Sequence, residues 1–229
     1  MSPSPPPPGN GTARRDGPAW ERRHSLFDLA ALFATVRDVL FDAGTTFARL
    51  VRDGGLASPL VYLLILGTAG GWIGLLWDTL LTAAWRSFAP AGDAMNPLGI
   101  DPVTRNIISA LIMPGLVLIT FFIISGIVHL FLMIVGGARY GFETTARVVA
   151  YASGSTAVFS LIPFCGGVIG FFWGLVVEII GIAAAHETDT GRATAAVLLP
   201  LLLCCLLCCA IVVSVRLAAP GVLNDVLPH

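Results

Sequence analysis

Two ionisable residues interrupt otherwise apolar stretches of the sequence and are the first candidates for chemistry. Glu178 lies in the stretch from Gly166 to His186, and His129 lies in the stretch between Arg105 and Arg139. Each stretch contains the roughly twenty residues that a helix needs to cross a bilayer. A charge buried there without a partner costs several kcal/mol, so ionisable residues at this depth indicate a functional site.

The two residues lie at similar depths in their helices. Glu178 precedes Glu187 by nine residues, or about 13 Å of helix, and His129 precedes Arg139 by ten residues, or about 15 Å. We therefore predict that His129 and Glu178 form an intramembrane polar pair. Two interpretations stay open: a proton- or ion-responsive pair, and a polar clamp that only fixes how the helices pack.

A row of glycines leads to Glu178. Gly166, Gly170 and Gly174 recur every four residues, and Glu178 is the next member of the row. At 3.6 residues per turn all four share one helix face. Small residues at this spacing let another helix approach closely, so the row predicts a helix-packing face into which Glu178 points.

The remaining residues with chemical potential point away from catalysis. A Cys-Cys-Leu-Leu-Cys-Cys group lies in an apolar helix, where thiols stay protonated and pack as small hydrophobes. Metal binding or acylation of these thiols is the alternative interpretation. The sequence contains no recognisable catalytic triad, metalloprotease motif, phosphate-binding loop or dinucleotide fingerprint. We expect no enzyme activity, no bound metal and no cofactor.

The composition is that of an integral membrane protein. Of the 229 residues, 56% are hydrophobic and 12% are charged, with a mean hydropathy of +0.85. Soluble domains carry about 25% charged residues. The net charge of −1 gives no electrostatic basis for binding nucleic acid.

The hydropathy pattern predicts an all-α, polytopic membrane protein with five transmembrane helices preceded by an amphipathic interfacial helix. Residues 1–24 are expected to form a disordered Pro/Gly-rich cytoplasmic tail, 25–53 the amphipathic region, 54–219 the transmembrane domain and 220–229 a short extracytoplasmic tail. The expected spanning segments are Pro59–Trp77, a segment within Arg105–Arg139, Val148–Ile162, Gly166–His186 and Ala193–Val215.

The amphipathic region is expected to begin with Ser25 as helix N-cap. An apolar stripe then follows helical spacing, through Leu26, Leu29, Phe33, Val36 and Leu40. This helix either lies on the membrane surface or covers the loop ends as a soluble cap.

Arginine positions predict the orientation. Ten of the thirteen arginines flank the spans on the side of the N-terminus. Because basic flanks stay in the cytoplasm, the N-terminus is expected to be cytoplasmic and the C-terminus extracytoplasmic, in a bacterial cytoplasmic membrane.

Several short motifs resemble one family when taken in order. They are Trp20-Glu21-Arg22, His129 to Gly137, Tyr140 to Tyr151, Ile162 to Gly167, His186 to Ala193 and Val197 to Pro200. Together they resemble the bacterial branch of the Yip family, membrane proteins named for interacting with Ypt/Rab GTPases, over roughly Trp20–Val215. The resemblance implies a five-helix domain with a cytoplasmic N-terminus. Eukaryotic relatives bind prenylated small GTPases, but their Asp-Leu-Tyr-Gly-Pro-type motif is absent here, so that partner is not carried over.

We therefore expect a non-catalytic membrane scaffold or adaptor with a cytoplasmic platform. Its expected partners are the lipid bilayer and either a second copy of the chain or a cytoplasmic protein. The alternative is a small transporter or channel in which Glu178 and His129 line a polar path. A water-accessible cavity that reaches Glu178 would favour the alternative.

Overall fold

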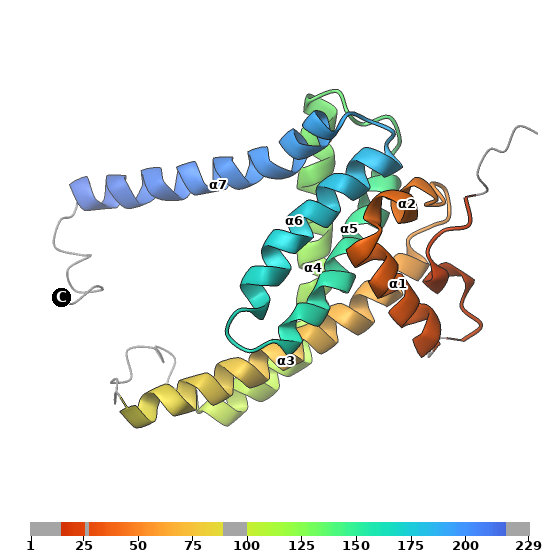
Figure 1. The fold of residues 1–229 in the computed structure, drawn as a ribbon. Coiled ribbons are helices and arrows are strands. Elements are labelled where there is room, and N and C mark those ends of the chain that lie inside the picture. The colour runs from red at the N-terminus through yellow and green to blue at the C-terminus, as the bar shows by residue number, and fades with distance from the viewer. Residues whose placement is uncertain (1–14, 26–27, 89–99, 219–229) are drawn as a thin grey trace, which may run out of the picture.

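The structure is a computed structural model that describes residues 15–25, 28–88 and 100–218, and within these ranges it is helical without strands (Figure 1). The helical segments are η1 (Ala19–Arg22), α1 (Leu29–Phe41), α2 (Ala43–Ala48), α3 (Ala57–Phe88), α4 (Pro102–Ile134), α5 (Phe142–Thr156), η3 (Ala157–Leu161), α6 (Gly166–Ala185) and α7 (Thr190–Ala218). The all-α prediction is confirmed.

Four of the described helices are long and apolar enough to cross a membrane. They are Ala57–Trp85, Pro102–Ile134, Gly166–Ala185 and Thr190–Ser214, with mean hydropathies of 1.8, 2.7, 2.2 and 3.1. The chain is thus a multi-pass membrane protein by length and composition. The expected spanning segment Val148–Ile162 does not form one long α-helix, because α5 ends at Thr156 and continues as the 3-10 turn η3.

Helix α5 is the centre of the bundle. Every residue from Thr144 to Ala152 is buried, and small residues follow at Gly154 and Ser155. Helices α3, α4 and α6 all pack against it. Helix α5 is therefore surrounded by other helices, and its small residues allow them to approach closely.

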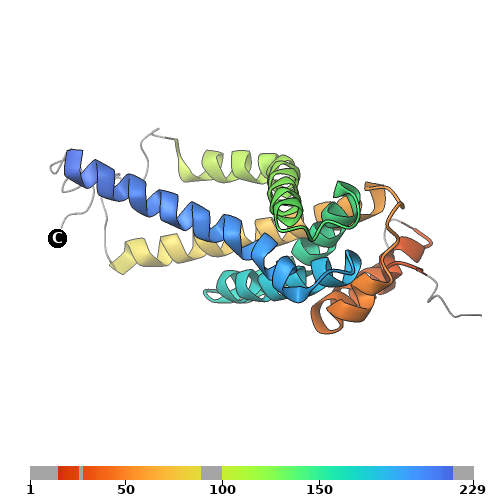
Figure 2. The same ribbon diagram turned by 90° about the horizontal axis from the view of Figure 1, so that it is seen from above.

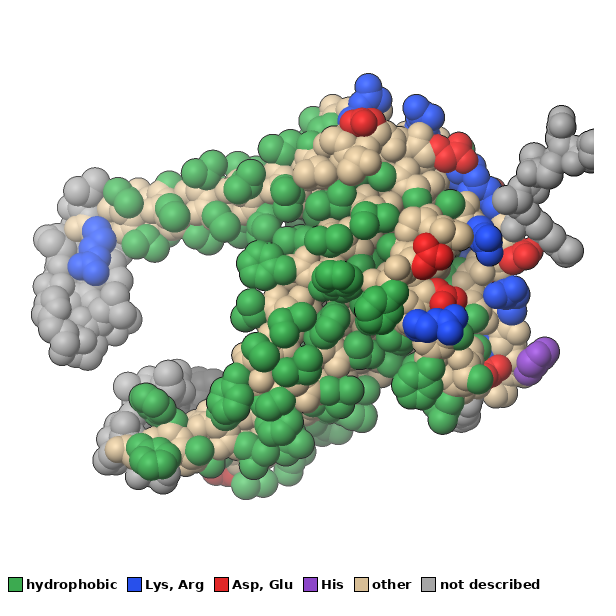
Figure 3. Space-filling model, in the orientation of Figure 1, with side chains coloured by type: hydrophobic (Ala, Val, Ile, Leu, Met, Phe, Trp, Pro, Cys, Tyr) green, Lys and Arg blue, Asp and Glu red, His purple; other side chains and the backbone are tan. Residues whose placement is uncertain are grey.

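The long helices diverge away from the centre. Helix α7 leaves the bundle as a separate arm, and α3 extends in the same general direction with the beginning of α4 beside it (Figure 1). Helix α4 changes direction along its length (Figure 2), and Pro114 lies inside it, where a missing N–H weakens the helix. Charged side chains gather at the opposite end, over α1 and α2, while both arms are mainly apolar, with a basic side chain, Arg216, in the last turn of α7 (Figure 3).

Residues 15–25 and 28–55, called here the N-terminal block, pack against α5 and α6 and form much of the charged end of the molecule. Trp20 is fully buried, and Gly17, with a left-handed φ of 66°, donates its N–H to the Arg49 carbonyl. The predicted boundary of the disordered tail at residue 24 therefore lies too far along the chain, because Trp20 is already buried against the bundle. Residues 1–14 and 220–229 lie outside the described part of the chain.

Helix α1 begins later than predicted and buries a different face. Asp28, not Ser25, is its N-cap and accepts the Ala31 N–H. Leu26 lies outside the described residues.

The buried face of α1 differs from the predicted stripe. Of that stripe, Val36 and Leu40 are buried, together with Leu32, Thr35 and Val39. Leu29 and Phe33 are 61% and 65% exposed, and Phe41 extends their row with 78% exposed. The helix therefore has one apolar side in the bundle and another on the surface.

Candidate functional site

A buried ion pair connects the N-terminal block to α5. The Arg147 guanidinium donates to Glu21 Oε1 and to the Gly55 carbonyl, and the Tyr151 hydroxyl donates to the same Glu21 oxygen at 2.8 Å. The side chains of Arg147 and Glu21 are only 1% and 12% exposed. Because both charges are removed from water, each depends on the other for its stabilisation.

Aromatic residues extend this connection. Trp20 donates its backbone N–H to Thr35 Oγ1 at 2.8 Å and its indole N–H to the Ser58 carbonyl at 3.0 Å. Its ring lies 5.8 Å from the Tyr62 ring, which lies 5.1 Å from the Tyr151 ring. The block is thus joined to both α3 and α5 by buried contacts.

A second polar cluster surrounds Glu187, just after α6. Glu187 Oε1 accepts from Arg15 at 2.7 Å and from Arg52 at 2.5 Å, while Oε2 accepts from the Tyr140 hydroxyl at 2.9 Å. The hydrogen bonds from Arg52 and then Tyr140 lower the pKa of Glu187 to about 2. Its φ of 51° is in the left-handed region, which is unusual for a residue other than glycine. Three donors hold the residue in this conformation.

His129 and His186 share one threonine. The Tyr140 N–H donates to His186 Nδ1 at 3.3 Å, so the neutral ring carries its proton on Nε2. That nitrogen donates to Thr145 Oγ1 at 2.9 Å, and the Thr145 hydroxyl donates to His129 Nδ1 at 2.8 Å. His186 is fully buried, and burial, followed by repulsion from His129 and Arg52, lowers its pKa to about 4.

These hydrogen bonds give His129 a partner, Thr145, that the sequence did not indicate. Its Nδ1 bonds with Thr145 of α5, whereas Glu178 Oε1 is buried and has no hydrogen-bond partner among the described residues. The structure shows no hydrogen bond between His129 and Glu178 in the described part of the chain. Their pairing stays a prediction.

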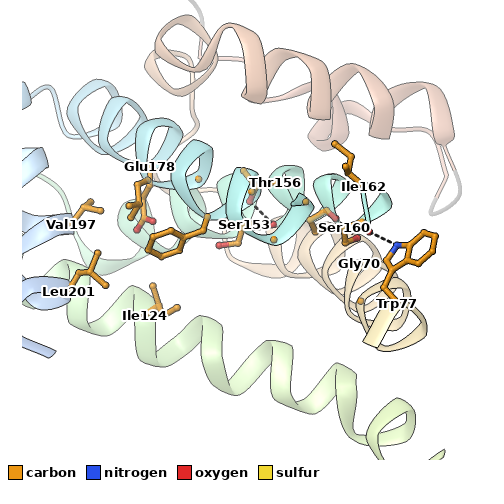
Figure 4. Close-up of a pocket in the computed structure, with 18 of the residues that line it drawn as sticks. Gly70, Trp77, Ile124, Ser153, Thr156, Ser160, Ile162, Glu178, Val197 and Leu201 are labelled. Carbon is orange, nitrogen blue, oxygen red and sulfur yellow. Dashed lines mark hydrogen bonds between the residues drawn. The ribbon is translucent and has the colours of Figure 1, made fainter. Parts of the chain in front are cut away.

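Glu178 lies instead on a large groove. The groove has a volume of about 870 Å³ and lies between α3, α4, α6 and α7, with the end of α5 and η3 as its floor. Figure 4 shows the Glu178 side chain pointing from α6 toward Val197 and Leu201 of α7. Trp77 and Asp78 line the groove from α3, and Trp77 donates its indole N–H to the Ser160 carbonyl at 3.1 Å.

The glycine row of α6 faces the end of α5 and η3. A Cβ at Gly166 would lie 2.0 Å from the Phe159 carbonyl oxygen, and one at Gly170 would lie 3.3 Å from the Thr156 carbonyl oxygen. At Gly174 the nearest atoms, on Thr156, are 3.7 Å away. The backbones are therefore closest at the hairpin and separate gradually toward Glu178.

The four cysteines of α7 do not converge on a site. Cys204, Cys205, Cys208 and Cys209 are free and exposed on the projecting arm. Within the described residues, no group of three or more His, Cys, Asp or Glu side chains is arranged to hold a metal ion.

One comparison decides the family. The model of the Yip1 domain matches residues 37–212, which is most of the chain. The chain belongs to the Yip1 domain family. Neither a curated protein nor a solved structure matches it.

The Yip1 match contains most of the site but not all of it. Arg147, His129 and Glu178 lie inside the matched range, whereas Trp20 and Glu21 precede it. The contact between Glu21 and Arg147 therefore joins the Yip1 domain to residues outside the family match.

Yip1 proteins are generally not enzymes.

The motifs Trp20-Glu21-Arg22 and Tyr140 to Tyr151 were identified in the sequence only as parts of the family resemblance. Their contact with each other was not predicted. No charge pattern in the sequence relates Glu21 to Arg147, which lies 126 residues away. A fully buried arginine can be anticipated only when its distant partner is known.

Proposed function

We propose that this Yip1 protein is a non-catalytic membrane scaffold or adaptor whose N-terminal block forms a cytoplasmic docking platform. The observation that carries the proposal is the buried Glu21–Arg147 pair, which fixes the block to the bundle. A scaffold needs a surface of constant shape outside the bilayer. The block supplies such a surface, and its Arg15 and Arg52 pair with Glu187, just after α6, which joins the block to the bundle a second time.

The location of α1 supports an interfacial role for the block. Leu29, Phe33, Arg37 and Phe41 form one row at intervals of four residues, and the three apolar members are more than half exposed. The indole of Trp173 donates to the Leu40 carbonyl at 3.1 Å, at the joint between α1 and α6. Exposed apolar residues beside arginine and tryptophan are typical of a helix at the membrane surface.

Five membrane crossings are consistent with the helix lengths. Helix α5 has 15 residues and η3 has five. At 1.5 Å and about 2.0 Å per residue they extend about 32 Å together, close to the ~30 Å hydrocarbon thickness. With five crossings, a cytoplasmic N-terminus puts the C-terminus outside a bacterial cytoplasmic membrane.

Cysteine labelling tests this orientation. In a variant without native cysteines, Arg49→Cys in the block and Phe164→Cys in the α5–α6 hairpin provide matched sites, because Phe164 is 81% exposed. A membrane-impermeant thiol reagent is expected to label Phe164→Cys in intact cells and Arg49→Cys only after lysis. The reverse pattern would place the block outside and refute a cytoplasmic platform.

Photo-crosslinking tests the platform itself. A photoreactive amino acid at Arg49 or Asp53 is expected to give a discrete crosslinked product in intact cells, to a cytoplasmic protein or to a second copy. The product should disappear when Glu21→Gln weakens the attachment of the block. The same amino acid at Phe164 is the control. Absence of a product at the block, or equal products at both ends, would contradict the proposal.

One observation favours the alternative of a transporter or channel. The groove reaches Glu178, although His129 is not among its lining residues. Labelling of Glu178→Cys by an impermeant reagent from either side of the membrane would show that water reaches this depth and would favour transport. Complete protection from both sides would favour a polar clamp in a scaffold.

A further inference from the structure

We propose that the groove binds a single-chain amphiphile with a cationic amine head, and that the head meets Glu178. The volume of about 870 Å³ lies within the range of small-molecule sites, about 300–1,000 Å³. This inference concerns a different part of the molecule from the docking platform and does not depend on it.

The charges of the groove select the head group. Two carboxylates, Asp78 and Glu178, are among the residues that line the groove, whereas no Arg, Lys or His in the described part of the chain lines it. Glu178 Oε1 is buried and lacks a hydrogen-bond donor within the described residues. An ammonium group supplies an opposite charge and N–H donors together, which makes the strongest type of hydrogen bond to a carboxylate.

The wall between the two carboxylates is suited to an alkyl chain. Hydroxyl groups occur along it, but Thr156 donates to the Ala152 carbonyl and Ser160 donates to the Ala157 carbonyl, so both are used within their own helical segments. Glycines keep the wall open: a Cβ at Gly74 or Gly167 would meet no atom within 4 Å. The free space is therefore lined mainly by apolar atoms.

Other membrane components fit less well. An anionic head would meet Glu178 without a cation to neutralise it, and an acyl chain alone would leave the carboxylate without a donor. A long-chain alcohol supplies one donor but no charge. The difference between an amine and an alcohol with the same chain therefore isolates the contribution of the carboxylate.

The experiment measures binding to the full-length protein in nanodiscs of zwitterionic lipid. The probes are dodecylamine, dodecanol and dodecanoate, each titrated against displacement of a fluorescent long-chain amine. Dodecylamine is expected to bind saturably and roughly tenfold more tightly than dodecanol, the factor for one charge-assisted hydrogen bond. Dodecanoate should bind most weakly. Equal affinities for the amine and the alcohol would overturn the proposal.

Four variants locate the site. Glu178→Gln should reduce the affinity for dodecylamine to that for dodecanol, while Glu178→Asp should retain the preference and shows that the site tolerates substitution. Gly74→Leu should weaken both ligands because it fills the groove. Gly115→Leu, at an exposed position outside the groove where a Cβ meets no atom within 4 Å, is the matched control.

The position of the head is tested by a fifth variant. Asp78→Asn should leave the preference for the amine unchanged. If Asp78→Asn removes the preference and Glu178→Gln does not, the head binds at the other end of the groove and the proposal is wrong. Retention of the preference in Glu178→Gln would likewise overturn it.

Discussion

Replacing Arg147 by methionine is expected to lower the free energy of unfolding by about 3 to 5 kcal/mol and to release the N-terminal block. Methionine fills much of the same space, so the loss is mainly electrostatic. Glu21, only 12% exposed, would keep the Tyr151 donor but lose its counter-charge. A buried carboxylate with one neutral donor is far less stable than one that is paired with a guanidinium.

The structure also predicts how this loss combines with a second change. Glu21→Gln removes the charge that the Arg147→Met variant leaves without a partner. The double variant should therefore lose less than the sum of the two single variants, by about 0.5 to 3 kcal/mol. This coupling separates the ion pair from packing effects of the methionine.

Two measurements check the prediction on protein in mixed micelles. Reversible unfolding by denaturant gives the free energy, and limited trypsin digestion reports cleavage after Arg22 and Arg23, which becomes faster when the block is released. Arg37→Met is the control, because Arg37 and Asp38 form a pair whose side chains are 73% and 38% exposed. Such surface pairs contribute about 0 to 1 kcal/mol.

A small effect would refute the reasoning. If Arg147→Met costs less than about 1 kcal/mol and trypsin cleaves the variant no faster than the unchanged protein, the ion pair does not hold the block. The aromatic contacts of Trp20 would then be sufficient for its attachment.

Two further predictions concern the glycine row and pH. Gly166→Ala should lower the midpoint of thermal unfolding by several degrees, because its Cβ would collide with a backbone oxygen, whereas Gly174→Ala should have little effect; equal effects would contradict the observed separation of the two segments. His186 has a pKa of about 4 when folded and an ordinary value of 6.5 when unfolded, so the unfolded chain binds more protons between these values. Stability should fall by up to about 3 kcal/mol as the pH falls from 6.5 to 4. In His186→Gln the free energy of unfolding should depend less on pH between 6.5 and 4. An unchanged dependence would show that His186 is not the residue responsible.

The class of the protein could be predicted from the sequence because length and hydropathy determine it locally. Each of the four long apolar helices can be recognised from the length and hydropathy of its own sequence. Helix α5 was harder to predict, since its first two turns contain Glu143 and Arg147, two charged residues that are more typical of a solvated loop. The predicted start at Val148 was therefore six residues too late.

The polar contacts could not be predicted because their partners are distant in the sequence. Arg147 is neutralised by a residue 126 positions away. His129 bonds with Thr145, a hydroxyl that no charge pattern distinguishes from its neighbours. The depth argument for His129 and Glu178 considered only ionisable residues, and so it did not include the uncharged side chain that His129 contacts.

The N-terminal block is translated long before the part of α5 to which it attaches. Glu21 leaves the ribosome 126 residues before Arg147. At about 5 to 20 residues per second, this separation corresponds to about 6 to 25 seconds. During that time α3 and α4 are made while the binding site for Trp20 and Glu21 on α5 does not yet exist. Trp20 and Glu21 therefore cannot reach their final positions before α5 is made, so the block closes onto the bundle only after α3 and α4 have been synthesised.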